Sequence, residues 1–342
     1  MRISILLLGQ IALSVLLLAP QLAISAEEVN VYSARKEKLI RPLLDRFTQQ
    51  TGIEVNLVTG KADALLKRLQ SEGRNSPADV LITTDAGRLH RAKQAGVTAS
   101  FRSEVLGAAV PASFRDPEGY WYGLTIRSRP IMYVKGRVDP ALLSTYEDLT
   151  NPKWRGRICI RSSSNIYNQS LVASLIAANG ATKTEAWSQG LVANFARPPR
   201  GGDRDQIRAA VAGICDIAIA NTYYLAGMLN AKDEAQRKIA EQIGVFWPNQ
   251  QDRGAHVNIS GAALTTSAKN KSNAIRLIEF MASKPAQEWY ASQNGEYPVR
   301  KDVPVHATLE AWGSFKMDDL NLARLGELNP EAVRIMDRAG WK

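Results

Sequence analysis

The chain has 342 residues, 45% of them hydrophobic and 22% charged, and a formal net charge of +10 at pH 7. This composition is typical of a globular chain long enough for two domains, which excludes a fibrous or disordered protein. The 43 Lys and Arg residues are interleaved with 33 Asp and Glu residues, and no basic block or nucleic-acid module occurs, so we expect no nucleic-acid partner. The excess positive charge indicates attraction for small anionic ligands or anionic surfaces, or an ordinary solvated surface.

Residues 1–26 have the pattern of a secretory signal peptide. Arg2 precedes an apolar run, and a stretch of small residues follows it and ends at Ala26. Gln10 and Pro20 interrupt the run, which argues against a permanent membrane anchor. We therefore expect cleavage near residues 25–26 and an exported mature protein.

Strand and helix patterns alternate from residue 28 onward. The expected strands are 29–32, 53–58 and 78–83. The first expected helix has its apolar face at residues 39–47, and two further helices are expected at 64–69 and 88–94. Ser33 is predicted to cap the first helix and Gly52 to end it. This order predicts a mainly parallel sheet with helices on both faces.

A second α/β unit begins after about residue 125. Its expected elements are strands at 156–160, 214–220 and 244–248 and helices at 168–178, 184–195 and 205–212. A strand at 261–264 and a helix at 274–281 then resume the first unit. A chain that crosses between two such units predicts two hinged lobes with a ligand cleft between them. The first lobe would comprise residues 27–125 and 250–342, including the C-terminal helices, and the second lobe residues 126–249.

Two cysteines and three histidines limit the chemistry. Cys159 and Cys215 lie in strand-like runs, and an exported compartment permits a disulfide between them; the alternative is two buried thiols. We predict the disulfide. No zinc-binding spacing and no local nucleophile signature accompanies the histidines, which argues against a zinc site or a catalytic cysteine.

Paired tyrosines offer a different kind of site. Tyr223 and Tyr224 follow the apolar run 214–220, where a chain leaves a sheet. Two phenols there can present hard oxygen donors to one ion, and phenolate is a known ligand of ferric iron. The alternative is an ordinary pair of aromatic residues, one in the core and one half-exposed.

Several motifs together resemble the ferric-ion-binding periplasmic proteins, which are the substrate-binding components of iron(III) ABC transporters. The resemblance covers essentially the whole mature chain. Its motifs are Val-Tyr-Ser-Ala-Arg at 31–35, Ser-Pro-Ala-Asp-Val-Leu at 76–81, Tyr-Gly-Leu-Thr-Ile-Arg-Ser-Arg at 122–129, Ser-Ser-Ser-Asn-Ile-Tyr-Asn at 162–168, Asn-Thr-Tyr-Tyr at 221–224 and Phe-Met-Ala-Ser-Lys-Pro-Ala-Gln-Glu-Trp at 280–289. The resemblance implies a type II periplasmic-binding-protein fold with two mixed sheets, a monomer, no enzymatic activity, and an inner-membrane ABC permease as partner.

The resemblance also implies a set of site residues. Tyr167, in a polar loop, would join Tyr223 and Tyr224 as iron ligands. Relatives carry a His, sometimes followed by Tyr, just after the first strand, where this chain has Lys36 and Glu37. That departure resembles the subgroup that uses three tyrosines and a synergistic anion, commonly carbonate. Arg127 matches the arginine that holds this anion, and Arg35 is a second candidate.

Charge balance supports the same hypothesis. Three phenolates would cancel the charge of Fe³⁺, and carbonate held by a planar guanidinium would supply further oxygens. The cargo would be ferric iron or a ferric chelate. The alternative is a two-lobe protein that binds a small anion, such as a phosphonate or organic acid, with Arg35, Arg127 and Arg129 as clamps and no metal. A secreted hydrolase is disfavoured because no nucleophile elbow occurs.

Overall fold

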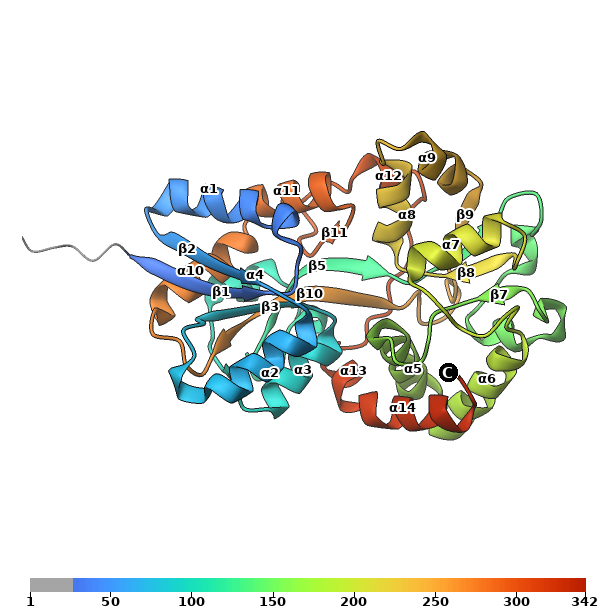
Figure 1. Cartoon of the computed structure of the whole chain (residues 1–342), viewed down its shortest axis with the longest axis horizontal. Helices are drawn as coiled ribbons and strands as arrows, with labels where there is room; N and C mark the ends of the chain where they lie inside the picture. The colour runs from blue at the N-terminus through green and yellow to red at the C-terminus, as the bar shows by residue number, and fades with distance from the viewer. Residues whose placement is uncertain (1–26) are drawn as a thin grey trace, which may run out of the picture.

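Two β-sheets organise the computed structural model, which describes residues 27–342 (Figure 1). The predicted signal peptide, residues 1–26, lies outside the described residues. The first sheet has seven strands in the order β11-β5-β10-β3-β1-β2, with β4 also paired to β10. Its strands are β1 (Glu28–Ser33), β2 (Glu54–Thr59), β3 (Val80–Thr84), β4 (Thr98–Ala99), β5 (Tyr122–Ser128), β10 (Val257–Thr265) and β11 (Tyr297–Pro298).

The direction of the strands makes the first sheet mixed. Strands β1, β2 and β3 are parallel, as the alternation of strands and helices predicts. Strand β10 then runs antiparallel to both β3 and β5, because it returns from the second half of the chain. The helices around this sheet are α1 (Arg41–Thr51), α2 (Ala62–Glu72), α3 (Ala86–Gln94), α4 (Glu104–Ala109), α10 (Lys271–Met281) and α11 (Lys284–Asn294).

The second sheet has four strands in the order β7-β8-β6-β9. They are β6 (Ile131–Val134), β7 (Ile158–Cys159), β8 (Ile217–Ile219) and β9 (Ile243–Phe246). The surrounding helices are α5 (Ile166–Asn179), α6 (Ala181–Ala193), α7 (Asp203–Val211), α8 (Thr222–Leu229) and α9 (Glu234–Glu241). The chain passes between the sheets twice, from β5 to β6 and from β9 to β10. The helices described from residue 27 onward include none long and apolar enough to cross a membrane.

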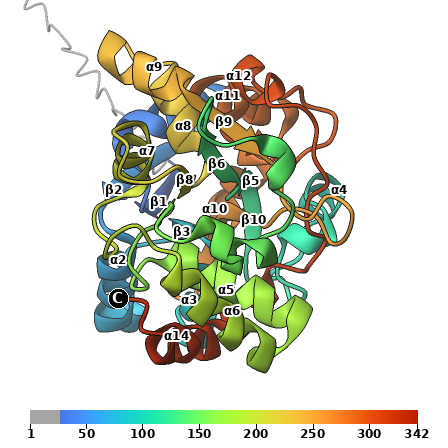
Figure 2. The ribbon, with the colours of Figure 1, turned by 90° about the vertical axis from the view of Figure 1, so that its right-hand side faces the viewer.

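The C-terminal helices touch both halves of the molecule. They are α12 (Ala307–Glu310), α13 (Ala323–Glu327) and α14 (Asn329–Arg338). Helix α13 packs against α3 and α5. Helix α14 packs against α5 and α6, as Figure 2 also shows. Ser170 of α5 adds a hydrogen bond across the same boundary, because its Oγ donates to Asp85, which caps α3, at 2.8 Å. The C-terminal segment therefore connects the two sheets rather than covering one alone.

One sequence expectation about the first helix is wrong. Ser33 does not cap a helix, since it ends β1 and its Oγ accepts from the backbone N–H of Arg35 at 3.2 Å. Helix α1 begins only at Arg41, with Pro42 in its first turn, where a missing N–H is tolerated. It ends at Gly52, as predicted, because this glycine adopts a left-handed conformation with φ 75°.

The predicted disulfide is confirmed. Cys159 of β7 is bonded to Cys215, which precedes β8, and the two residues are 56 positions apart. Strands β7 and β8 are parallel neighbours, so the bond joins the start of β8 to the adjacent strand. The bridge thus anchors the strand that leads to Tyr223 and Tyr224.

Removing this bridge should destabilise the protein. A Cys159→Ala/Cys215→Ala variant should lose about 4 kcal/mol of unfolding free energy, because the unfolded chain regains the entropy of an open loop of this length. Denaturant unfolding measures the loss. Reduced wild-type protein is the matched control, since it lacks the bridge but keeps both sulfurs. An unchanged unfolding midpoint in both samples would contradict the prediction.

Candidate metal centre

The three candidate tyrosines lie in the first turns of two helices. Tyr167 is the second residue of α5, whose N-terminus is capped by Asn165, which accepts from the Tyr167 N–H at 3.2 Å. The expectation that Tyr167 lies in a loop is therefore wrong. Tyr223 and Tyr224 occupy the first turn of α8, directly after β8. The N-terminal end of a helix carries partial positive charge, which favours a phenolate there.

The structure brings these three phenols together. The rings of Tyr223 and Tyr224 lie 4.3 Å apart between centroids, and both side chains are half-buried. Burial, then the nearby Tyr167 phenol, raises the pKa of Tyr224 to about 12. The pKa of Tyr223 rises well above its ordinary value for the same reasons, with Tyr224 as a further contributor. Before a cation arrives, Tyr223 and Tyr224 therefore hold their protons at neutral pH.

Arg127 reaches this cluster from the other sheet. It lies on β5, which contacts α8, and its positive charge acts to lower the pKa of Tyr223 against the dominant effect of burial. Its side chain is 1% exposed, and Nη2 donates to Ser260 Oγ at 3.1 Å. Its Nε and Nη1 atoms are buried and have no hydrogen-bond partner within residues 27–342. A buried guanidinium with unused donors is suited to holding an anion.

Arg35, unlike Arg127, forms an ion pair within residues 27–342 in addition to a hydrogen bond. Its Nη2 forms an ion pair with Glu296 at 2.7 Å, and its Nη1 donates to Ser260 Oγ at 2.9 Å. Arg35 and Arg127 therefore meet at one hydroxyl group. Sequence reasoning missed Ser260 and Glu296, because each is more than 130 positions from its arginine partner and no local pattern marks it.

Arg129 holds in place the helix ends that carry the tyrosines. Its guanidinium donates to Asp203 at 2.7 Å, to Asn221 at 3.0 Å and to Asn168 at 2.7 Å. These partners stand at or near the first turns of α7, α8 and α5. The hydrogen bonds therefore fix the helix ends that carry the phenols. Because Nη1 and Nη2 are occupied and Nε alone has no partner among the described residues, Arg129 is less suited than Arg127 to act as the anion clamp of the alternative hypothesis.

A second arginine also holds Asp203. Arg161 pairs with this fully buried carboxylate at 2.6 Å and lies 5.9 Å from the centroid of the Tyr167 ring. Sequence reasoning missed both residues. The glycine pair before Asp203 could have indicated that Asp203 lies in the first turn of a helix, where acidic residues are favoured.

Lys36 and Glu37, which stand where the resemblance implies further ligands, lie at the surface. Lys36 and Glu37 are exposed, and Glu37 pairs with Arg41 at 3.1 Å. Two other tyrosines are occupied elsewhere, because Tyr32 donates to Glu72 and Tyr122 donates to the Phe101 carbonyl at 2.9 Å. In the described part of the chain, no group of three His, Cys, Asp or Glu side chains could hold a metal ion.

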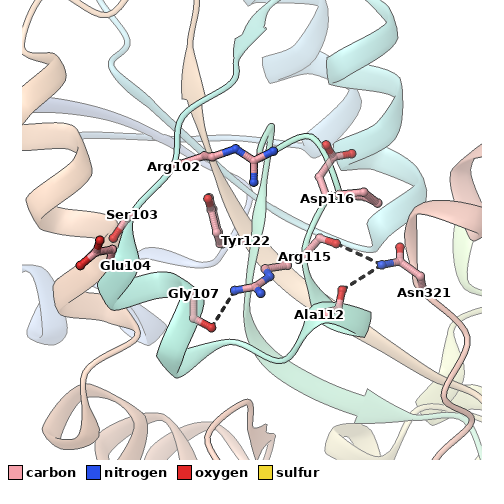
Figure 3. Close-up of a pocket in the computed structure, with 11 residues that line it drawn as sticks. Arg102, Ser103, Glu104, Gly107, Ala112, Arg115, Asp116, Tyr122 and Asn321 are labelled. Atoms are coloured by element: carbon pink, nitrogen blue, oxygen red, sulfur yellow. Dashed lines mark hydrogen bonds between the residues drawn. The ribbon is translucent and has the colours of Figure 1, made fainter.

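A separate cavity of about 410 Å³ opens beside β5 on the first sheet (Figure 3). Arg102, Arg115 and Tyr122 line it, and Arg115 donates to the Gly107 carbonyl at 2.8 Å. None of the candidate tyrosines, nor Arg35 or Arg127, lines this cavity. It is therefore distinct from the tyrosine cluster.

Comparisons with known proteins cover nearly the whole chain. Residues 75–324 match the model of a family described as bacterial extracellular solute-binding protein. The chain is 51% identical to Iron uptake protein A1 of Synechocystis sp. over 316 residues, which is 92% of this chain and 88% of that protein. A Trichodesmium FutA (IdiA) structure in complex with iron and citrate ligands shares 49% identity and a TM-score of 0.90, and covers 92% of this chain and 100% of that one.

A second solved structure agrees in fold. Apo FutA2 from Synechocystis has a TM-score of 0.89 and 46% identity, and the match covers 93% of this chain and 100% of that one. With the two mixed sheets of Figure 1, these matches confirm the predicted α/β periplasmic-binding-protein fold.

Proposed function

The chain belongs to the bacterial extracellular solute-binding proteins, and we propose that it captures ferric iron and passes it to an inner-membrane ABC permease. It is a solute-binding protein and not an enzyme. The observation that carries the proposal is the meeting of Tyr167, Tyr223 and Tyr224 at helix N-termini, beside the partly unpartnered guanidinium of Arg127. The protein would act in the periplasm as a monomer, after loss of residues 1–26.

The proposed lobes place the cleft between the sheets. Residues 27–125 with 250–342 would form one lobe and residues 126–249 the other. The three phenols belong to the second lobe and Arg127 to the start of it, on a strand that continues the first sheet. Closure of the lobes would therefore bring the phenols and the arginine side chains around one ion.

Iron capture would proceed by proton release. A trivalent cation at bonding distance deprotonates its ligands, and three phenolates would neutralise Fe³⁺. The adjacent phenols of Tyr223 and Tyr224 are neutral without the cation, so these two residues would add no bare negative charge to the empty site. The three-tyrosine set is the ligand set that we propose, because Lys36 and Glu37 are exposed and Glu37 is already paired.

An anion would complete the coordination shell. Carbonate is our candidate, because its planar oxygens match the fork of Arg127 and its remaining oxygens could reach the ion. Citrate is present with iron in the Trichodesmium structure, which supports an anion of some kind. The metal-free alternative has no comparable support, since Nη1 and Nη2 of Arg129 are already occupied by Asp203, Asn221 and Asn168.

Ferric loading tests the proposed function. Protein mixed with a ferric salt and bicarbonate, then freed of unbound metal, should show a visible charge-transfer band and one iron per chain by elemental analysis. Phenolate bound to ferric iron produces such a band, and a chelator should remove it. Colourless protein without bound iron would reject the proposal and favour the small-anion alternative.

Replacing Arg127 tests the role of the anion. The Arg127→Gln variant should release iron to a competing chelator about 10- to 100-fold faster, as expected when a group that holds a metal ligand is removed. The loss should depend on which anion is supplied. Arg102→Ala, which removes an exposed positive charge lining the cavity of Figure 3, is the control and should retain wild-type rates. Equal release from both variants would contradict this role for Arg127.

A further inference from the structure

Two positive charges converge on the first-sheet side of the proposed anion position. Arg35 and Arg127 both donate to Ser260 Oγ, at 2.9 Å and 3.1 Å. Ser260 lies on β10, which is hydrogen-bonded to the strand that carries Arg127. Both arginines are buried, so water screens their mutual repulsion poorly. Such a pair requires negative charge nearby.

Glu296 supplies one negative charge to this pair. Its carboxylate lies 2.7 Å from Arg35 Nη2, and the two side chains are only 5% and 6% exposed. Burial acts to raise the pKa of Glu296, but the charges of Arg35 and Arg127 outweigh it and hold the pKa below its ordinary value. Glu296 is therefore ionised at neutral pH, pairs directly with Arg35 and also acts electrostatically on Arg127.

The position of Glu296 is built into the fold. It follows Gly295, the left-handed C-cap of α11, and precedes β11, whose Tyr297 pairs with Ile126 beside Arg127. Gly295 also lies against α8, because a Cβ placed on it would stand 3.1 Å from the Cβ of Ala226. The backbone on either side of Glu296 therefore contacts the strand of Arg127 and the helix of Tyr223.

We propose that Glu296 is a specificity-determining residue that sets the charge of the anion accepted beside the tyrosines. The inference rests on the proposed function, and it adds the selection of the anion by charge. Glu296 neutralises Arg35 and leaves the free donors of Arg127, Nε and Nη1, to face the anion. Its repulsion acts twice as strongly on a doubly charged anion as on a singly charged one. Glu296 therefore lowers the preference of the cleft for doubly charged over singly charged anions.

Anion binding to the iron-free protein tests this selection directly. Nitrate and sulfate are suitable probes, because neither changes its charge near neutral pH. Their affinities are measured by calorimetry at constant ionic strength, since salt screens the effect. In Glu296→Gln, the affinity for sulfate relative to nitrate should rise on the order of tenfold or more, as removal of one nearby buried charge predicts.

Matched variants separate charge from structure. Glu288→Gln removes the same charge from an exposed position on α11 and should keep the wild-type sulfate-to-nitrate ratio. Glu296→Asp retains the charge and should also keep it. Arg35→Gln should shift the ratio in the opposite direction. The double variant Arg35→Gln/Glu296→Gln restores the wild-type net charge and should return the ratio towards the wild-type value.

The outcomes distinguish this inference from the proposed function. A ratio in Glu296→Gln equal to that in Glu288→Gln, or no binding of either anion to wild-type protein, would overturn the role of Glu296. If Glu296→Gln does not fold, the sign of the Arg35→Gln shift decides instead, and an unchanged ratio there overturns the proposal. Ferric loading of wild-type protein is measured separately, so its failure would reject the iron function and not the charge selection.

Discussion

Replacing Tyr167, Tyr223 or Tyr224 with phenylalanine is expected to lower the affinity for ferric iron by roughly 100- to 1000-fold. Structural zinc sites give the scale: they bind the metal with apparent energies of about 10–16 kcal/mol through four ligands, so the loss of one ligand should remove a few kcal/mol. Phenylalanine keeps the ring, and the packing of the Tyr223–Tyr224 pair should survive. Competition with a chelator of known affinity measures the loss, and the visible band should weaken or shift in each variant.

Tyr120→Phe provides the control for these substitutions. Tyr120 is half-buried on the first-sheet side, with Lys93 over its ring, and it lies outside the cluster of three phenols. Its loss should leave iron affinity and the visible band unchanged. The ligand assignment would be wrong for any candidate tyrosine whose phenylalanine variant behaves like Tyr120→Phe.

Acid should release iron steeply. Burial raises the pKa of both Tyr223 and Tyr224, so these phenols are protonated in the iron-free protein at neutral pH. Iron must displace these protons, and binding therefore weakens as the proton concentration rises. If all three phenols lose a proton on binding, the apparent affinity should fall by up to about three decades per pH unit. Protonation of the carbonate should steepen the loss further.

Chelator competition at a series of pH values, with free ferric iron buffered, measures this slope. Proton release on loading, followed in weakly buffered solution, gives an independent count. The Tyr→Phe variants should release one proton fewer than wild-type protein. An affinity that does not change with pH would show that phenolates do not hold the cation.

Strands, helix ends and pairs of adjacent residues could be predicted from the sequence, because each leaves a local pattern. Alternating apolar residues located β1, β2 and β3, and glycine marked the end of α1. Tyr223 and Tyr224 were visible because they are neighbours directly after an apolar strand. The prediction of a helix cap at Ser33 was wrong, because serine accepts a local backbone hydrogen bond as readily at a strand end as at a helix cap.

The partners of the site residues were not predictable in this way. Arg35 is separated from Glu296 by 261 positions in the sequence and from Ser260 by 225. Contacts between residues so far apart produce no periodic pattern in the sequence. Asp203 joins Arg129 and Arg161 through the arrangement of three helix ends, which only the fold determines. Burial of Arg127 with unused donors is likewise a property of packing around β5 and β10.

X-ray diffraction at the iron absorption edge, from crystals of ferric-loaded protein, tests the central claim most directly. We expect one anomalous peak per chain, within bonding distance of the hydroxyl oxygens of Tyr167, Tyr223 and Tyr224, with an anion between the peak and Arg127. A peak elsewhere, or a peak that any one of the three phenols does not reach, would contradict the proposed ligand set.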